Sequence, residues 1–463
     1  MIGPKKQIGK VAIASMIAAV FIFTSFFSLT MNVSADSFTL ESGGYSYSAE
    51  VTISKFDRLL YENRIIDNGW YNGPTDVMTQ APNGDYLGFV REGIAHVGDN
   101  GSLKLYRSTD DAITWTLNAT LRNITDKDTR NYACGVTDHG RIFVFYSTYD
   151  ATNDSWPSPI EYMYSDNNAT TWSANTSLTI PTLSGLVPVG ASAWGMLRIL
   201  GDGRVGVTYY AWNATNATQN RFAYSDNNGA TWSHIVIGAT VANFGRTETD
   251  FIYLGNSRIV ALARMEAIAG PEMFRSTDNG LTWTADGALP QGLTAGTGAY
   301  MSLITDDVGA SWVFSFFNQG ATTHYMIANG DDLMNHGVSA WPSLVDAPII
   351  SSGFPFTLID QGTGIGIVMG EIEASSSEEF VLIWNLTAEL TKSRYPTSIS
   401  PMITVIAIMF AIGIVVGVIA EGTKSLRKEK LPTTQEMVKS VLNMVIYIVI
   451  GMALIGVVYS ALG

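Results

Sequence analysis

The segment "FRSTDNGLTWT", residues 274–284, decides the fold, because three diverged copies of its central phrase lie upstream. Aligned on their shared Thr-Trp ending, the four phrases are "STDDAITW" (108–115), "SDNNATTW" (165–172), "SDNNGATW" (225–232) and "STDNGLTW" (276–283). They begin 57, 60 and 51 residues apart. Repeats at such a period predict one supersecondary unit that is stacked several times.

A second feature recurs with the same period: a turn between two apolar runs, as in "RILGDGRVGVTYY" (198–210). The flanking β-branched and aromatic residues suit strands, and the small residues at the turn allow a positive φ, so each segment predicts a β-hairpin. The six turns are centred on Gly84, Gly140, Gly203, Ser257, Gly309 and Gly362. Six such units over residues 66–390 predict an all-β, six-bladed β-propeller, in which radial repetition leaves only short, protected strand edges.

The four phrases, called the boxes below, have the composition of a hairpin lock. Their Asp or Asn side chains can accept bonds from turn amides, their Gly tolerates a left-handed conformation, and their Trp can pack between strands. Spread one to a blade on the rim, their acidic residues cannot converge on one substrate. We therefore expect a structural role for the boxes, and neither catalysis nor metal binding.

The boxes resemble the Asp boxes of the sialidase (neuraminidase) superfamily, over roughly residues 66–390. The resemblance implies a sialidase-like propeller fold. It does not by itself imply sialidase activity, because one fold carries many functions.

The two ends of the chain predict membrane segments. Lysines at positions 5, 6 and 10 precede an apolar run, which predicts a signal peptide over residues 1–35 or, alternatively, an uncleaved N-terminal anchor. Residues 36–65 form a leading strand segment, and a linker covers residues 391–398. The apolar segments 399–420 and 441–463 are each long enough to span a bilayer, which predicts a C-terminal transmembrane hairpin.

The loop between these two segments, residues 421–440, carries five Lys or Arg against three Glu, so the positive-inside rule predicts that it is cytoplasmic. The propeller would then be extracellular, at the cell membrane. The Asn-x-Ser/Thr sequons of the chain are compatible with a surface glycoprotein; eight of them begin at Asn118, Asn123, Asn153, Asn168, Asn175, Asn213, Asn216 and Asn385. The single cysteine, Cys134, cannot form an internal disulfide.

The charge of the chain limits its partners. Without the basic N-terminus and the loop 421–440, 19 Lys and Arg remain against 38 Asp and Glu, a net charge of −19. Such a surface repels nucleic acid, so we expect no nucleic-acid partner, although a high-salt habitat or solubility would explain the charge equally well.

In a propeller, the first strand of each blade lines the axis, and its start lies about nine residues before the hairpin turn. The positions so predicted to face the axial mouth are the Pro74 region, Arg130 or Asn131, Trp194, Glu248, Tyr300 and Phe354. Aromatic rings beside a carboxylate favour a carbohydrate or glycoprotein partner. The alternative is that the rings simply plug the channel.

The segment "TETDFIYLGNSRIVALARME" (247–266) resembles the sialidase segment that contains a buried glutamate and one arginine of the carboxylate-binding triad. The resemblance implies these roles for Glu248 and Arg264; the alternative is an ion pair that links two strands. The segment "REGIAHVGDNGSLKLYRS" (91–108) resembles the family's acid/base loop, with Arg91 as a ligand-binding residue and Asp99 as the proton-transferring aspartate. A solvated turn is the alternative for Asp99.

Three departures from the family pattern argue against sialidase activity. Asn72-Gly73-Pro74 stands where the family has its first triad arginine, and no arginine occurs between Arg275 and Arg394, where the third would lie. The family's tyrosine nucleophile falls in "GFPFTL" (353–358), which has no hydroxyl-bearing ring.

Two hypotheses from different classes follow. The first is a membrane-anchored surface propeller that recognises glycans, as an adhesin or a receptor-like protein without sialidase activity. The second is a divergent glycoside hydrolase using paired carboxylates, with Asp99, Glu92, Glu248 and Glu371 as candidates. An envelope or virion structural protein is a third possibility. None of these readings calls for a cofactor or a metal ion.

Overall fold

The computed structural model describes residues 34–396, except for residues 43–44, 60–76, 94–99, 113, 151, 154, 157–158, 290–291, 306–308, 320–321, 343, 347–352, 363–364 and 376–377. For β1, β2, β24 and β25, and for β23 apart from Ile359, the description covers the backbone. The chain divides into two compact units, and the larger one includes the continuous stretch Glu50–Ala388. The sites described below lie in this larger unit.

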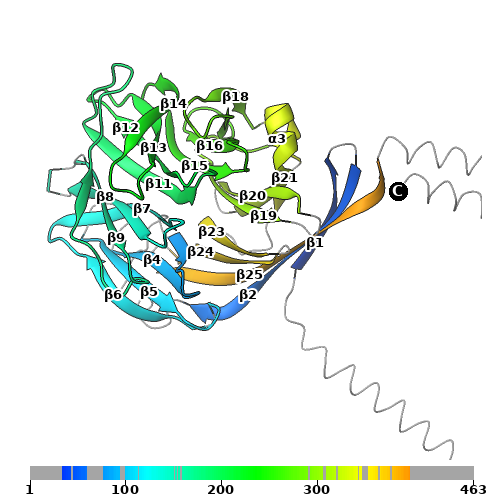
Figure 1. The fold of residues 1–463 in the computed structure, drawn as a ribbon, viewed down its shortest axis with the longest axis horizontal. Helices are drawn as coiled ribbons and strands as arrows, with labels where there is room; N and C mark the ends of the chain where they lie inside the picture. The colour runs from blue at the N-terminus through cyan, green and yellow to red at the C-terminus, as the bar shows by residue number, and fades with distance from the viewer. Residues whose placement is uncertain are drawn as a thin grey trace, which may run out of the picture. The chain divides into compact units, whose positions relative to one another are not determined.

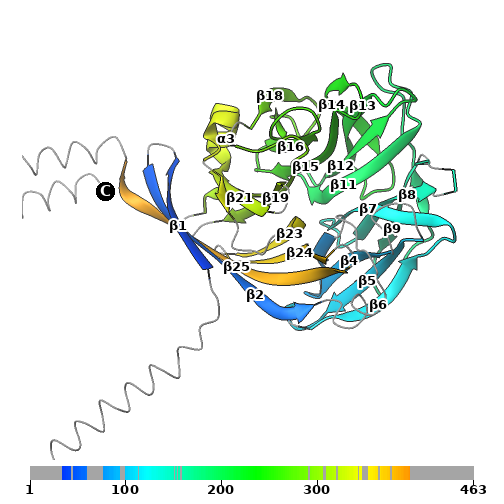
Figure 2. The same ribbon diagram turned by 180° about the vertical axis from the view of Figure 1, so that it is seen from behind.

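The larger unit is built almost entirely of antiparallel sheets (Figures 1 and 2). One four-stranded sheet contains β3 (Val77–Gln80), β4 (Tyr86–Glu92), β5 (Ser102–Ser108) and β6 (Thr116–Arg122). A second four-stranded sheet contains β15 (Arg246–Tyr253), β16 (Ile259–Met265), β17 (Glu272–Ser276) and β18 (Thr284–Ala288). A third contains β19 (Gly298–Thr305), β20 (Ser311–Gln319), β21 (Thr322–Asn329) and β22 (Val345–Asp346).

An eight-stranded sheet joins two antiparallel halves through one parallel pair, Met196 with Cys134. Its halves are β7 (Lys127–Val136), β8 (Ile142–Asp150), β9 (Ile160–Ser165) and β10 (Thr176–Leu178), and β11 (Gly190–Ile199), β12 (Val205–Trp212), β13 (Thr218–Ser225) and β14 (Ser233–Val241). The remaining sheet has the order β1 (Ser34–Ser42), β2 (Tyr45–Leu59), β25 (Glu378–Pro396), β24 (Ile365–Ser375) and β23 (Gly353–Gly362).

Helix is scarce in the described residues. The α-helix α3 (Gly330–His336) begins where the Asn329 side chain accepts bonds from the amides of Asp331 and Asp332, and it continues into the 3-10 helix η1 (Gly337–Ala340). Both connect β21 to β22. No helix in this part of the chain is long and apolar enough to cross a membrane. The predicted membrane segments 399–420 and 441–463 and the loop 421–440 lie outside the described residues, as do residues 1–33.

The first strands of successive four-stranded units contact one another in sequence order. β3 contacts β7, β7 contacts β11, β11 contacts β15, β15 contacts β19, β19 contacts β23, and β23 contacts β3 again. This closed series surrounds a common axis, as a β-propeller-like fold requires.

Five of the six predicted hairpin turns fall where the sequence places them; the sixth is predicted at Gly362, which ends β23, and residues 363–364 after it lie outside the description. Gly84, Gly140, Gly203, Ser257 and Gly309 all have positive φ, between 64° and 92°. Each lies between the first and second strand of its unit. The choice of small residues at these turns therefore reflects a left-handed backbone that larger residues rarely adopt.

Each box connects the third and fourth strands of its unit and is locked by its own side chains. In the fourth box, Ser276 Oγ accepts bonds from the amides of Asp278 (3.3 Å) and Gly280 (3.0 Å). The amide of Thr282 donates to Asp278 Oδ1 (2.9 Å), and the indole of Trp283 donates to the Gly280 carbonyl (2.9 Å). Gly280 has a φ of 80°, so the hairpin lock predicted from sequence is confirmed at this box.

The boxes also hold neighbouring units together. A box tryptophan packs edge-on against a phenylalanine of the preceding unit, with ring centroids 5.8–5.9 Å apart: Trp172 on Phe89, Trp232 on Phe143 and Trp283 on Phe222. Arg141 of the second unit donates to the carbonyl of Asn228 in the third box (3.1 Å). The apolar core accordingly lies between adjacent sheets, where for example Phe222 packs edge-on against Phe251 (5.3 Å).

Candidate functional site

The candidate site lies at the starts of the first strands, where the sequence predicts the axial mouth. Arg130 is on β7, Trp194 on β11, Glu248 on β15 and Tyr300 on β19. Phe354 is the second residue of β23, and its backbone pairs with that of Glu371 on β24. The side chains of these two residues lie outside the description, as does all of Asp99.

Glu248 and Arg264 form an ion pair between adjacent strands, with Glu248 Oε2 3.0 Å from Arg264 Nη1. A second carboxylate, Glu266, binds the other edge of the same guanidinium, 2.9 Å from Nε and 3.3 Å from Nη2. The hydroxyl of Thr247 donates to Glu266 Oε1 (3.1 Å). One arginine is therefore shared by two carboxylates, and the group carries a net charge of −1 when both are ionised.

Burial governs the protonation of this group. The Glu248 side chain is 15% exposed, and burial raises its pKa against the opposing pull of Arg264. The carboxylate of Glu248 in turn raises the pKa of Arg264 above its ordinary value, so the arginine stays charged. Gly298 lies close by: a Cβ there would come within 3.5 Å of Glu248 Oε2.

A second charged group lies between the first and second units. Arg91 donates to both oxygens of Asp128, Nε to Oδ1 at 2.8 Å and Nη2 to Oδ2 at 3.0 Å, and neither side chain is exposed. Arg130 Nη1 lies 3.6 Å from Asp128 Oδ2, and burial, followed by the charge of Arg91, lowers the pKa of Arg130. Gly101 is required here, because a Cβ would lie 2.0 Å from Asp128 Oδ1.

Tyr210 lies close to both charged groups. It pairs with Ser192 across β11 and β12. Burial raises the pKa of Tyr210 to about 12, and the nearby charge of Glu248 adds to the rise, while Arg130 opposes it. Asn131, held at a φ of 56° in a bulge of β7, donates from its amide to Ser192 Oγ.

Two of the predicted aromatic residues contact each other. The rings of Trp194 and Tyr300 lie 5.3 Å apart, and the two residues are only 3% and 5% exposed. This contact reaches from β11 to β19, the strands on either side of β15. Their burial fits a plug better than an open stacking surface for a sugar.

Glu92, a predicted catalytic carboxylate, is buried on β4 and pairs with Lys104 (Nζ to Oε2, 3.0 Å). Arg91, the predicted ligand-binding residue beside it, has no exposed side-chain surface, because it packs against Asp128. Glu248 and Arg264 are thus brought together, Arg130 and Arg91 share Asp128, and Glu92 has its own partner. The roles assigned to these residues stay predictions.

Sequence reasoning missed three residues of the site: Glu266, Asp128 and Tyr210. Glu266 had a signal, since it follows Arg264 by two residues, and strand alternation places such residues on one face. Tyr210 could have been found by counting across the hairpin from Ser192. Asp128 had no such signal, because its partner Arg91 is 37 residues away in another sheet.

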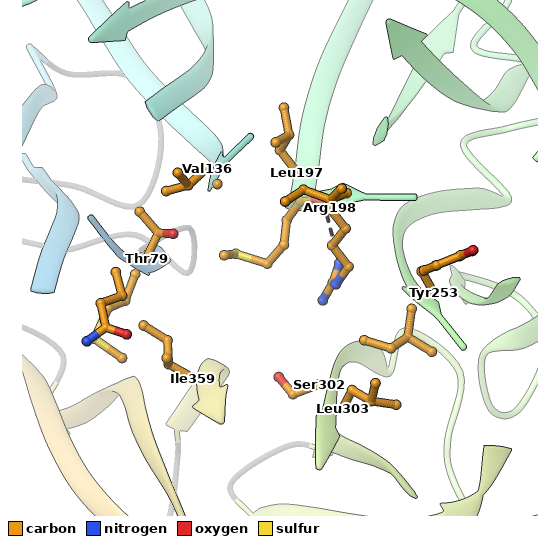
Figure 3. A pocket seen from close by; sticks show the side chains of 14 residues that line it. Thr79, Val136, Leu197, Arg198, Tyr253, Ser302, Leu303 and Ile359 are labelled. Atoms are coloured by element: carbon orange, nitrogen blue, oxygen red, sulfur yellow. Dashed lines mark hydrogen bonds between the residues drawn. The ribbon is translucent and has the colours of Figure 1, made fainter. Parts of the chain in front are cut away.

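A separate pocket of about 400 Å³ lies farther along the same strands (Figure 3). All six first strands line it, through Met78, Thr79, Gln80, Gly135, Val136, Met196, Leu197, Arg198, Ile199, Ile252, Tyr253, Ser302, Leu303 and Ile359. Arg198 is the charged residue of this lining, and it is bound by Asp250 (2.5 and 3.1 Å) and by the carbonyl of Met301 (2.5 Å). None of the residues predicted for the site lines this pocket.

Comparison with known proteins agrees with this fold. Residues 95–297 match the BNR repeat-like domain family. Among curated proteins, none matches the chain significantly. A crystal structure of a protein of unknown function from Dyadobacter fermentans is similar, with 14% identity and a TM-score of 0.58; the match covers 72% of this chain and 99% of that one.

Two sialidase structures are also similar. Trypanosoma rangeli sialidase in complex with the inhibitor DANA has 12% identity and a TM-score of 0.54, and the match covers 67% of this chain and 54% of that one. A Hadza microbial sialidase has 14% identity and a TM-score of 0.52, with 68% and 65% covered. The chain thus spans about half the length of the trypanosomal enzyme. Residues 95–297 thus match a BNR repeat-like domain, and the fold of the chain is similar to that of sialidases.

Proposed function

We propose that this protein is a membrane-anchored, extracellular, six-bladed propeller that recognises neutral glycans at the cell surface, as an adhesin or a receptor-like protein, and that it does not release sialic acid. Its solved relatives include sialidases, one of them in complex with sialic acid. Their fold supports a carbohydrate partner here, and the charged groups at the candidate site support the choice of a neutral one.

The observation that carries the proposal is the pairing of the arginines. Arg264 is bound by both Glu248 and Glu266, and Arg91 and Arg130 are both beside Asp128. Each guanidinium of the described site thus already faces a carboxylate of the chain. A sugar carboxylate would have to compete with these carboxylates for the guanidinium groups. Each charge-assisted bond that it formed would contribute only about 1.5–3 kcal/mol. A neutral sugar can instead use the carboxylates as hydroxyl acceptors.

The test of this proposal is the hydrolysis of a fluorogenic sialoside by the purified full chain in detergent, with a known sialidase as positive control. We expect no release above the buffer rate. Release that is lost in both Glu248→Gln and Arg264→Ala would refute the proposal. Arg204→Ala is the matched control, because it also breaks an arginine–carboxylate pair, with Asp226 (2.6 Å), but in the box hairpin region.

The blade count and the orientation belong to the same proposal. The closed series of six first strands supports six blades. The basic loop 421–440 supports an extracellular propeller. Protease added to intact cells should therefore digest the propeller and spare this loop; digestion of the loop with an intact propeller would reverse the orientation.

A second candidate function is glycoside hydrolysis, favoured by one observation. Glu248 has a raised pKa, as a general acid needs, and Glu266 provides another carboxylate on the same arginine. Hydrolysis of a neutral aryl glycoside that is lost in both Glu248→Gln and Glu266→Gln would support an enzyme. Binding of the intact glycoside without turnover would support recognition alone.

A further inference from the structure

Five aromatic residues gather at the same end of the larger unit as the candidate site. They come from the end of β8, the β8–β9 connection, the end of β12 and the β14–β15 connection: Tyr149, Trp156, Tyr210, Trp212 and Phe244. We call this group the aromatic shelf. Since β8 and β12 run antiparallel to β7 and β11, their ends lie beside the starts of those first strands.

The rings of the shelf form a continuous series. Trp156 packs against Tyr149 (5.3 Å between centroids) and edge-on against Trp212 (6.1 Å). Trp212 in turn packs against Tyr210 (5.6 Å) and Phe244 (5.5 Å). Tyr149 and Trp212 are buried, whereas Trp156, Tyr210 and Phe244 are half-buried and keep part of their surface in solvent.

The backbone is shaped to hold this series. Gly190 pairs with Trp212, and a Cβ on Gly190 would lie 2.4 Å from the indole, so only glycine lets the strand lie against the ring. Phe244 has a φ of 52°, which is rare for a bulky residue, and the preceding Asn243 has a φ of 55°. Backbone strain of this kind is concentrated at binding and catalytic sites.

The shelf reaches the charged groups of the candidate site at two of its residues, Trp156 and Tyr210. The Arg130 guanidinium lies 5.3 Å from the centre of the Trp156 ring. Tyr210 lies near Glu248, whose charge helps to raise the pKa of the Tyr210 phenol. The shelf is thus continuous with the site at which the proposed function places a sugar.

We propose that the exposed parts of Trp156, Tyr210 and Phe244 form a second sugar subsite, so that this protein recognises an oligosaccharide and not a single sugar. The inference rests on the proposed function and deepens it. One sugar would lie at Glu248 and Arg264, and the next would stack its apolar face on the shelf. Partly exposed aromatic rings beside polar groups have the mixed character that a sugar ring requires.

The experiment compares binding of the full chain in detergent to immobilised neutral glycans of one to six sugars. The wild type should bind chains of two or more sugars about tenfold more tightly than single sugars, because one aromatic stacking contact is of that order. Trp156→Ala should lose this gain and keep the binding of single sugars, which shows that the variant is folded. Trp156→Phe should retain most of the gain.

Leu117→Ala is the matched control, since Leu117 is 40% exposed on β6 and is not part of the shelf. If Trp156→Ala does not fold, Phe244→Leu replaces it, with the same expected loss. A wild type that binds single sugars and longer chains equally, or shelf variants that keep the full gain, would overturn the subsite and leave the proposed function standing. A wild type that binds no glycan at all would overturn both.

Discussion

Replacing Asp128 with asparagine should strongly destabilise the larger unit. Arg91 and Asp128 are both fully buried and joined by bonds of 2.8 and 3.0 Å, and Arg130 lies 3.6 Å from the same carboxylate. The substitution removes the negative charge that these two buried guanidinium groups share. Breaking a buried pair from one side costs about 3–5 kcal/mol.

The assay for this prediction is urea unfolding of the full chain, followed by tryptophan fluorescence. Asp166→Asn is the control: Asp166 also binds an arginine through two bonds, 2.7 and 2.9 Å from Arg141, but its side chain is 56% exposed. Exposed pairs contribute about 0–1 kcal/mol. Equal losses in the free energy of unfolding for the two variants, or a loss below about 1 kcal/mol for Asp128→Asn, would contradict the prediction. Either result would show that burial does not increase the contribution of the Arg91–Asp128 pair to stability.

Two further predictions concern stability. Burial and then the charge of Arg221 lower the pKa of His234 to about 4, below its ordinary 6.5, so the unfolded state binds a proton first as the pH falls. The stability that His234 contributes is therefore complete above pH 6.5 and is lost between pH 6.5 and 4. The free energy of unfolding of His234→Gln, measured in urea, should depend less on pH in this window than that of the wild type. Gly229→Ala should destabilise by more than about 2 kcal/mol, because its Cβ would lie 2.1 Å from Phe143, whereas Gly287→Ala, equally left-handed but with open space, should cost less. Equal urea midpoints for the two glycine variants would contradict the packing argument.

The repeat architecture could be read from the sequence because its determinants are local. A box contains its own hydrogen-bond donors and acceptors, so four copies of "S-x-D/N-x-x-x-T-W" predict four similar turns. The same is true of hairpin turns such as Gly140, where one residue must accept a positive φ. The strand pair Glu248–Arg264 could also be predicted, because both residues belong to one hairpin of β15 and β16.

The rest of the site depends on contacts between units, which local patterns do not encode. The distance of nine residues before each turn places Trp194 at the axis but does not say that Tyr300 buries it. Asp128 meets Arg91 only because neighbouring sheets pack face to face. The aromatic shelf likewise joins residues from connections of different units, so nothing in the sequence around Trp156 indicates its neighbour Trp212.

The most direct test of the account is a comparison of one glycan with and without its terminal sialic acid, as ligands for the full chain. Because Arg264 is already bound by Glu248 and Glu266, we predict that the chain binds the neutral glycan at least as tightly as the sialylated one. A preference of tenfold or more for the sialylated glycan, lost in Arg264→Ala, would show that this arginine does bind a substrate carboxylate and would contradict the account.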